Sequence, residues 1–449
     1  MTRRQTLILL ATILGSGIVI LDGTVVNLAL PKIAHNLHAS FADLQWIADS
    51  FLLSLSALIL VGGSLGDIFG RKKLYLIGII GFGISSLLCG LAPNTAFLIS
   101  ARLLQGIFGA LLVPGALAII NTNFPAKLRG AAIGSWSAWI AIFAPLGPIL
   151  GGYLLDVTSW RWIFLINPPF VALCAVLAWS NFEESRDQNP RRVDVPGSLL
   201  AIGALTGITY GLIEGPTNHW HVSSLVPLLA GVICSIAFLY VEKRVKDPIV
   251  PLGLFTSRNF SGSNLMTFMM YGALGGFLFA FVIYLQNALH YSSIKAGVSV
   301  LPLPIALFLL SKRFGALSAR LGPRIFMTLG PLFTAAGILS MYKLHATNSY
   351  LWHILPGMLL FGFGMSLLVA PLTVTVMASV NETSSGIASG INNAVARVSG
   401  LFVVAILGLF GTHSYYKFAI ILCGAMAIAS GVISYAIIVN PKSKKSLAK

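Results

Sequence analysis

Long apolar runs recur along the whole chain and constrain what it can fold into. A helix needs about 20 apolar residues to cross the ~30 Å hydrocarbon core of a bilayer, and fourteen segments of this 449-residue chain are of about that length. Only 9% of the residues are charged, against roughly 25% in soluble domains. The sequence therefore predicts an all-α integral membrane protein, and it excludes a soluble enzyme, a secreted disulfide scaffold and a disordered chain.

The fourteen expected helices alternate across the membrane. They cover the ranges 6–30, 44–65, 74–92, 96–122, 131–154, 163–180, 197–214, 223–241, 261–286, 295–313, 324–344, 351–379, 386–411 and 416–438. With the N-terminus in the cytoplasm, 22 of the 29 Lys and Arg residues fall on inner segments, 5 on outer segments and 2 within helices. This excess is the positive-inside pattern. It predicts two cytoplasmic termini, and it indicates that the net charge of +16 serves topology and contact with anionic lipid rather than nucleic-acid binding.

The two ends of the chain resemble each other. The segment GSLGDIFGRK at 63–72 is similar to GALSARLGPR at 315–324, and further matches follow at a nearly constant offset. Parallel repeated halves are typical of transporters. We therefore divide the chain into a six-helix bundle (1–181), a linker with an inserted helix pair (182–260), a second six-helix bundle (261–440) and a basic cytoplasmic tail (441–449).

Several motifs follow one another in a specific order. LDGTVVNLALPKI occupies 21–33, and Gly63, Asp67, Gly70 and Arg71 belong to the pattern G-x-L-x-D-x-x-G-R-K. Arg102 and Gln105 belong to L-x-x-x-R-x-x-Q-G, and G-P-x-x-G-G is formed by Gly147, Pro148, Gly151 and Gly152. By these motifs the chain resembles the major facilitator superfamily and, within it, the fourteen-helix drug:proton antiporters. The resemblance implies the major facilitator fold, with two six-helix halves plus an inserted helix pair.

Two positions depart from the pattern of that family. Phe143 stands four residues before Gly147, where the antiporter motif has a glycine, and Ala319 stands where the first repeat has Asp67. The first departure weakens the antiporter assignment slightly. The second predicts that the two cytoplasmic gates are not equivalent.

Three charges lie in the outer half of the first repeat, within expected membrane spans. They are Asp22, Asp49 and Arg102, and each costs on the order of 2.5–3.5 kcal/mol at a helix centre. We expect a proton to load on Asp22 or Asp49 while Arg102 responds as a movable cation. Asp22 is the deeper of the two acids, and desolvation favours the neutral form of a carboxyl group. The alternative is a static ion pair.

The remaining motif residues are expected to act as gate and packing elements. The resemblance implies that Gly63, Asp67, Gly70 and Arg71 form a cytoplasmic gate. Gly147, Pro148, Gly151 and Gly152 predict a closely packed, kinked helix, because proline removes a backbone donor and glycine permits close approach. In the family this motif is associated with preventing a proton leak, and ordinary helix packing is the alternative.

The substrate site is less well marked. Arg397 and Asn393 lie one turn apart within an expected span and could contact substrate oxygens, or Arg397 could cap carbonyl groups of a broken helix. Trp136 and Trp139 are candidates for lining an apolar cavity, although most aromatic side chains in such a chain face lipid or other helices.

These features predict a proton-coupled antiporter that exports amphipathic or cationic compounds from the cytoplasm by alternating access. A major facilitator transporter of one specific solute, such as an organic anion, a lipid precursor or a sugar, is the alternative. An enzyme is not expected, because no clustered nucleophile or acid/base set, metal-ligand spacing or phosphate loop occurs. We expect a monomer in the bacterial cytoplasmic membrane that uses the proton gradient and no bound cofactor or metal.

Overall fold

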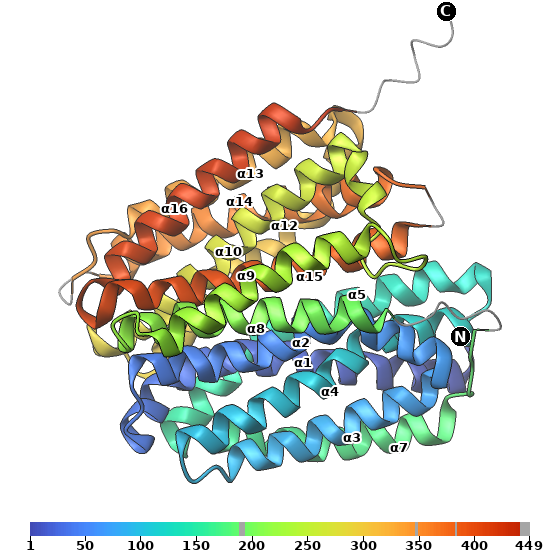
Figure 1. The fold of residues 1–449 in the computed structure, drawn as a ribbon, viewed down its shortest axis with the longest axis horizontal. Helices are drawn as coiled ribbons and strands as arrows, with labels where there is room; N and C mark the ends of the chain where they lie inside the picture. The colour runs from blue at the N-terminus through green and yellow to red at the C-terminus, as the bar shows by residue number, and fades with distance from the viewer. Residues whose placement is uncertain (188–193, 346–348, 382–383, 441–449) are drawn as a thin grey trace, which may run out of the picture. The chain divides into compact units, whose positions relative to one another are not determined.

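The structure is a computed structural model that describes residues 1–187, 194–345, 349–381 and 384–440. The described part of the chain is helical and contains no strand (Figure 1). The expected basic tail at 441–449 lies outside these residues.

The first expected bundle consists of seven helical pieces. They are α1 (Arg3–Leu37), α2 (Phe41–Phe69), α3 (Arg71–Gly90), α4 (Thr95–Asn123), α5 (Ala126–Val157), α6 (Trp162–Leu165) and α7 (Asn167–Asn181). Capping boxes at Thr2 and Ser40 start the first two helices, because each side chain satisfies backbone N–H groups that have no partner within the helix. The expected span at 163–180 is interrupted at Ile166, where two prolines occupy the first turn of α7.

A helical hairpin follows, formed by α8 (Val195–Thr217) and α9 (Val222–Glu242). A side chain at Gly207 would collide with the backbone at Gly231 (2.8 Å to its Cα), so the two helices touch through their main chains. This hairpin covers the ranges 197–214 and 223–241 that the sequence predicts for the inserted pair. A short 3₁₀ turn, η1 (Leu252–Thr256), comes next.

The described residues of the second half form seven α-helices, together with short turns of other helix types. The α-helices are α10 (Arg258–Asn287), α11 (Ser293–Val300), α12 (Pro302–Leu321), α13 (Pro323–Ser340), α14 (Leu355–Ala378), α15 (Ser385–Leu407) and α16 (Gly411–Ile437). The π turn η2 (Tyr350–Ile354) precedes α14, and the 3₁₀ turn η4 (Gly408–Phe410) follows α15. The expected span at 295–313 is two helices that meet at Leu301, because Pro302 has no backbone N–H to continue the helical hydrogen bonds.

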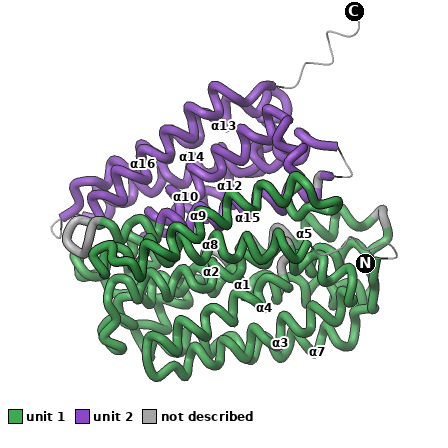
Figure 2. The backbone as a smooth tube through the Cα atoms, in the orientation of Figure 1, with its two compact units in different colours: residues 1–251, 278–298, 404–415 green, residues 252–277, 299–403, 416–449 purple. Residues whose placement is uncertain are grey.

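Contacts divide the chain into two compact units (Figure 2). Unit 1 comprises residues 1–251, 278–298 and 404–415, and unit 2 comprises 252–277, 299–403 and 416–449. Within unit 1, α4 packs against α2 and α3, and α1 packs against α5. Within unit 2, α14 packs against α12 and α13. The two helices of the inserted pair belong to unit 1. The units are defined by contacts between residues, whereas the domains expected from the sequence were defined by its internal repeat, so the two divisions differ.

Twelve helical segments in the described residues are long and apolar enough to cross a membrane. They include both helices of the inserted pair. Helices α6 and α7 together form one of these segments, and α11 and α12 together form another. Two of the fourteen expected spans, 131–154 and 324–344, correspond to α5 and α13 and are not among the twelve. Helix α13 has only 18 residues and begins with Pro323 and Arg324. The chain is thus a multi-pass membrane protein, and twelve segments of its described part are long and apolar enough to cross the membrane.

We predict that the turn at His219 and the turn at Gly70 lie on opposite sides of the membrane. Trp46, near the start of α2, donates a hydrogen bond to Glu214, near the end of α8 (2.8 Å), so these helices are antiparallel. In intact cells an impermeant thiol reagent should label His219→Cys and not Lys73→Cys, and inverted vesicles should show the reverse. Labelling of both positions from one side would contradict this arrangement.

Candidate functional site

A buried ion pair joins α1 to α4 in unit 1. The Arg102 Nη1 group donates to the Asp22 carboxylate, and each of the two side chains is 1% exposed. Removing two charges from water costs several kcal/mol per ion, which their attraction offsets only when further hydrogen bonds satisfy the remaining groups. The structure therefore brings together two of the three charges that the sequence singles out.

Two amides complete the surroundings of this ion pair. Gln105 donates to Asp22 Oδ1 (3.0 Å) and accepts from Arg102 Nη1 (2.8 Å). Asn167, at the start of α7, donates to the same Asp22 oxygen (3.4 Å) and to the Ser86 hydroxyl of α3 (2.9 Å). The network thus connects α1, α3, α4 and α7, and both Asp22 oxygens have donors.

Arg102 also reaches α2. Its Nε group donates to the carbonyl oxygen of Ile47 (3.3 Å), and its guanidinium carbon lies 4.4 Å from the centre of the Phe51 ring. Such stacking on an aromatic face partly replaces the lost hydration of a buried cation. Arg102 therefore lies between the helix that carries Asp22 and the helix that carries Asp49.

Asp49 has no such partners. Its side chain is 0% exposed, and both carboxylate oxygens lack a hydrogen bond to any residue that the structure describes. Asp22, at 1% exposed, is just as buried. The expected difference in depth thus does not appear as a difference in exposure, and what distinguishes the two acids is that only Asp22 has partners.

The expected gate residues lie together at the α2–α3 turn. Arg71 donates to Asp67 Oδ1 from Nη2 (2.7 Å) and Nε (2.9 Å). Gly70 has φ 110°, a conformation that favours glycine, and a side chain there would also meet Glu184. Glu184 accepts the N–H groups of Lys72 and Lys73 (3.1 Å each) and so caps the start of α3. Gly63 is less restricted, since its nearest neighbour is the Pro114 side chain at 3.6 Å.

The glycines of the G-P-x-x-G-G motif serve two contacts of α5. Side chains at Gly147 or Gly151 would collide with Thr24 or Val25 of α1, respectively. A side chain at Gly152 would instead meet the backbone of Ile294 at the start of α11 (2.7 Å). The carbonyl oxygen of Pro148 stands close against Gly297 of α11. The motif thus lets side chains of α1 and the backbone of α11 pack directly against the backbone of α5.

Phe143, the departure from the antiporter motif, packs against a glycine of another helix. A side chain at Gly17 of α1 would lie 2.7 Å from the Phe143 ring. Gly17 thus leaves room on α1 for the Phe143 ring, and α1 and α5 remain in close contact despite this departure from the motif.

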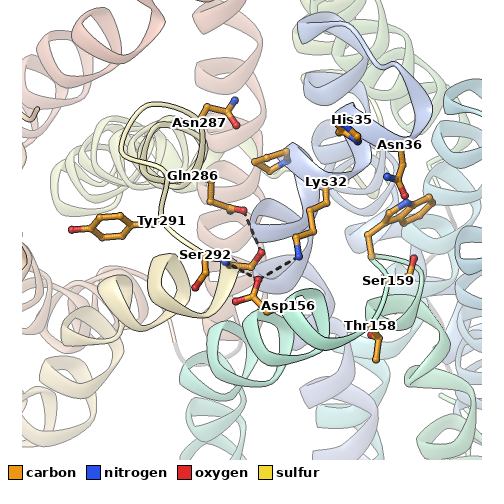
Figure 3. A pocket seen from close by; sticks show the side chains of 13 residues that line it. Lys32, His35, Asn36, Asp156, Thr158, Ser159, Gln286, Asn287, Tyr291 and Ser292 are labelled. Carbon is orange, nitrogen blue, oxygen red and sulfur yellow. Dashed lines mark hydrogen bonds and ion pairs between the residues drawn. The ribbon is translucent and has the colours of Figure 1, made fainter. Parts of the chain in front are cut away.

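At the end of α5, Asp156 holds the start of α11 (Figure 3). Its carboxylate accepts the N–H groups of Ser293 (3.0 Å) and Ile294 (2.9 Å) and forms an ion pair with Lys32 (3.3 Å). Lys32, Asp156 and Ser293 border a polar cavity of about 460 Å³, which Gln286 and Trp160 also line. An anion at a helix N-terminus is favourable, so this cluster fixes the start of α11 against the end of α5 within unit 1.

A second cavity, of about 240 Å³, lies among α1, α5, α6 and α7. Its lining is apolar except for Asn167, the residue that donates to Asp22. The apolar lining residues include Leu14, Ile18, Leu21, Val25, Phe143, Leu146, Leu150, Ile163 and Phe170. One side chain thus borders this cavity and belongs to the buried charge network.

The residues expected at a substrate site are not gathered in one place. Trp136 donates from its indole to the Thr12 carbonyl (3.3 Å) within unit 1, and Trp139 is 54% exposed. In unit 2, Asn393 is exposed and donates to Ser389 of its own helix (3.0 Å). Arg397 is partly exposed and has no hydrogen bond or ion pair with the described part of the chain. None of the four lines either cavity.

Several contacts were not anticipated from the sequence. Asn167 is a polar residue that precedes two prolines in an apolar run, and a polar residue within a membrane span is a signal for a functional site. Asp156, Lys32 and Glu184 lie near expected helix ends, where charged residues are common. Nothing in their spacing indicates that they meet segments more than 100 residues away.

The chain matches known proteins along most of its length. The family profile described as Major Facilitator Superfamily matches residues 12–404. The puromycin resistance protein of Streptomyces alboniger is 38% identical over 403 residues, which is 88% of this chain and 79% of the relative. The methylenomycin A resistance protein of Streptomyces coelicolor is 31% identical and covers 97% of this chain and 93% of the relative. The tetracenomycin C resistance and export protein of Streptomyces glaucescens is 34% identical, covering 89% of this chain and 75% of the relative.

Solved structures share the fold at low sequence identity. A peptide transporter in complex with sulfate superposes with a TM-score of 0.73 at 16% identity, covering 96% of this chain and 94% of the other. The xylose transporter XylE of E. coli, in a partially occluded inward-open conformation, has a TM-score of 0.65 at 15% identity, with 97% and 100% covered. At such identities these likenesses show the fold alone.

We predict that Asp67→Asn slows transport while leaving the substrate KM nearly unchanged. The variant loses the ion pair with Arg71 at the gate, and a partly exposed pair contributes about 1 kcal/mol or less, so turnover should fall about two- to fivefold. Initial rates over a range of substrate concentrations measure this. Ala319→Gly, at the equivalent position of the second repeat, is the control and should be silent; equal damage from both changes would contradict the asymmetry.

Proposed function

Because the chain belongs to the Major Facilitator Superfamily, we propose that it exports amphipathic, drug-like compounds from the cytoplasm in exchange for protons. The family makes it a transporter rather than an enzyme, and its relatives are antibiotic and multidrug resistance exporters. The observation that carries the proposal is the combination of these relatives with two buried carboxyl groups, one paired with Arg102 and one without a partner.

The topology that goes with this function has fourteen spans, with α5 and α13 added to the twelve candidate segments. Both termini then lie in the cytoplasm, as the positive-inside pattern favours. The chain acts as a monomer in the bacterial cytoplasmic membrane, since an alternating-access site lies within a single chain of this fold. It belongs to the drug:proton antiporters of the family and uses the proton gradient with no bound cofactor.

Coupling rests on the contrast between Asp49 and Asp22. An ionised carboxylate without a donor is very costly in an apolar interior, so Asp49 carries a proton in this conformation. Asp22, by contrast, accepts hydrogen bonds from Arg102, Gln105 and Asn167. Arg102 already contacts the α2 backbone two residues before Asp49. When Asp49 releases its proton, Arg102 shifts toward the new charge, and Asp22 in turn accepts a proton.

The apolar cavity of about 240 Å³ is the candidate site for the apolar part of a substrate. Its single polar side chain, Asn167, also holds Asp22. A compound that displaces Asn167 weakens the stabilisation of the Asp22 charge, which links substrate occupancy to proton uptake at that carboxyl. Pockets of this kind, apolar with few polar groups, are typical of small-molecule sites.

Export of one defined compound is the second candidate. The names of two relatives refer to single antibiotics, puromycin and methylenomycin A, which favours this narrower range. Resistance and accumulation assays with a panel of unrelated dyes and antibiotics, in a host without its own pumps, distinguish the two. Protection against one compound alone would favour the narrow alternative, and lack of protection or transport of any compound would contradict export.

We predict that Asp49→Asn abolishes transport driven by a pH gradient but keeps substrate exchange without a gradient, because the amide mimics the protonated carboxyl and cannot release a proton. Asp22→Asn should also lose driven transport, and it should lower stability by about 3–5 kcal/mol because Arg102 is left as an unpaired buried charge. Reconstituted vesicles with an imposed pH gradient, together with thermal unfolding, measure both effects.

Asp43→Asn is the matched control for these variants, since it removes an acid from the exposed first turn of α2 and keeps an acceptor for the helix cap. It should transport normally. Full gradient-driven transport by Asp49→Asn would remove Asp49 as a proton carrier, and the same result for Asp22→Asn would leave Asp22 with a purely structural role.

We predict that Leu146→Trp impairs transport by filling the apolar cavity. Overfilling a packed site costs about 1–3 kcal/mol, so substrate affinity should fall about tenfold or more. Ile149→Trp is the control, because residue 149 is on the same helix and is 39% exposed but does not line the cavity. Dye-binding titrations compare the two variants; an equal loss in both would argue against this cavity as the binding site.

A further inference from the structure

Two buried carboxyl groups meet where the inserted hairpin begins and ends. Asp194 precedes α8 and caps it, since its Oδ1 accepts the N–H of Gly197 (2.9 Å). Glu242 is the last residue of α9, and its Oε2 accepts the N–H of Val250 (3.0 Å). The two residues are only 6% and 3% exposed. Together they connect both ends of the hairpin to the segment that leads on to η1.

In each carboxyl group, one oxygen accepts no hydrogen bond from the described residues. Asp194 Oδ2 and Glu242 Oε1 are buried and have no hydrogen-bond partner in the described residues. Both point to the same place: Glu242 Oε1 lies 2.8 Å from the position that a Cβ at Gly197 would occupy, and Asp194 Oδ2 lies still closer to it. The two oxygens are therefore within roughly 5 Å of each other, a distance at which like charges repel strongly.

Among the residues that the structure describes, no basic side chain pairs with either carboxyl group. Arg244 places its guanidinium over the Tyr240 ring (4.3 Å), and Lys243 and Lys246 are exposed. On α2, which packs against α8, the acid Asp67 is paired with Arg71. The groups that act on the Glu242 carboxyl are the Asp194 carboxyl and the N–H groups at positions 249 and 250.

The number of free oxygens at this site limits which ion it can bind. Ca²⁺ binds six to eight oxygens and Mg²⁺ requires a nearly complete octahedron, whereas this site offers two free oxygens. No group of three or more His, Cys, Asp or Glu side chains suited to a metal occurs in the described chain. A proton needs only one oxygen to hold it and a second to accept it, and such an O–H···O⁻ bond between carboxyl groups is short and strong.

We infer that Asp194 and Glu242 bind one proton between them, and that this proton fastens the two ends of the inserted hairpin to the segment at 249–251. With the proton bound, one group donates to the other and both leftover oxygens are satisfied. As the pH rises and the proton leaves, two buried charges face each other, so the contact loosens and the N–H of Val250 loses its acceptor. The site responds to pH on the side of the membrane where α8 begins. It does not depend on whether transport is coupled to protons.

Infrared titration of the full-length protein in lipid tests the shared proton directly. The wild type should lose one protonated-carboxyl C=O signal between about pH 5 and pH 8, the range to which paired carboxyl groups shift. Glu242→Gln and Asp194→Asn should each remove that signal, because the remaining carboxyl group no longer faces a second one. The signal of Asp49, if protonated, should be the same in the wild type and in both variants. Asp247→Asn, which removes an acid from the same linker, is the matched control and should keep the signal.

Hydrogen–deuterium exchange of the segment 249–251, corrected for the pH dependence of intrinsic exchange, tests the fastening. Protection should fall with rising pH in the wild type and in Asp247→Asn. It should stay high in Glu242→Gln, whose amide still accepts from Val250 and donates to Asp194 at every pH. Thermal unfolding and elution volume verify that each variant is folded.

Three outcomes would overturn the inference. The first is a wild-type infrared titration identical to that of Glu242→Gln, and the second is protection at 249–251 with the same pH dependence in both proteins. The third is loss of the carboxyl signal at constant pH when Mg²⁺ or Ca²⁺ is added, which would make the pair a cation site. None of these measurements depends on transport, so they are independent of the proposed export function.

Discussion

Hydrocarbon offers no hydrogen-bonding partner, so every polar group inside the membrane must find one within the protein. The network of Asp22, Arg102, Gln105 and Asn167 meets this requirement with groups from three helices, and Ser86 adds a fourth. Its position explains why α1, α3, α4 and α7 meet as they do in unit 1. Asp49 differs from this network, because neither of its carboxyl oxygens has a hydrogen-bond partner among the described residues.

Close helix packing is the second condition on which this site depends. Helices in a membrane gain little from the hydrophobic effect and associate through tight packing. The glycines of α5 allow side chains of α1 to pack against its backbone on one face and the backbone of α11 to approach on the other. The Asp156 carboxylate adds a polar contact to the second of these interfaces. A transporter has to make and break such contacts, and a short polar cluster can separate at less cost than a large apolar interface.

Much of the site followed from residue type and spacing. Charges are so costly within apolar runs that Asp22, Asp49 and Arg102 could be singled out from the sequence. The ion pair between Asp22 and Arg102 fits both the coupling role and the static pair that was its alternative. The sequence favoured Asp22 over Asp49 on depth alone. Solvent exposure does not separate them, and what differs between them is the hydrogen-bond partners. Neither Ile47 nor Asn167 could be assigned to this network from spacing along the chain.

The sequence by itself determined the membrane environment, the helical fold and the repeated halves, since these depend on hydropathy and local periodicity along the chain. It also determined the family, through motifs in a specific order. Only the tertiary structure decided which polar groups meet. Asp156 reaches α11, Glu184 caps α3, and Asp194 faces Glu242, each across a long stretch of sequence. Such pairings depend on how helices are rotated and placed side by side, and a pattern of apolar residues does not specify this.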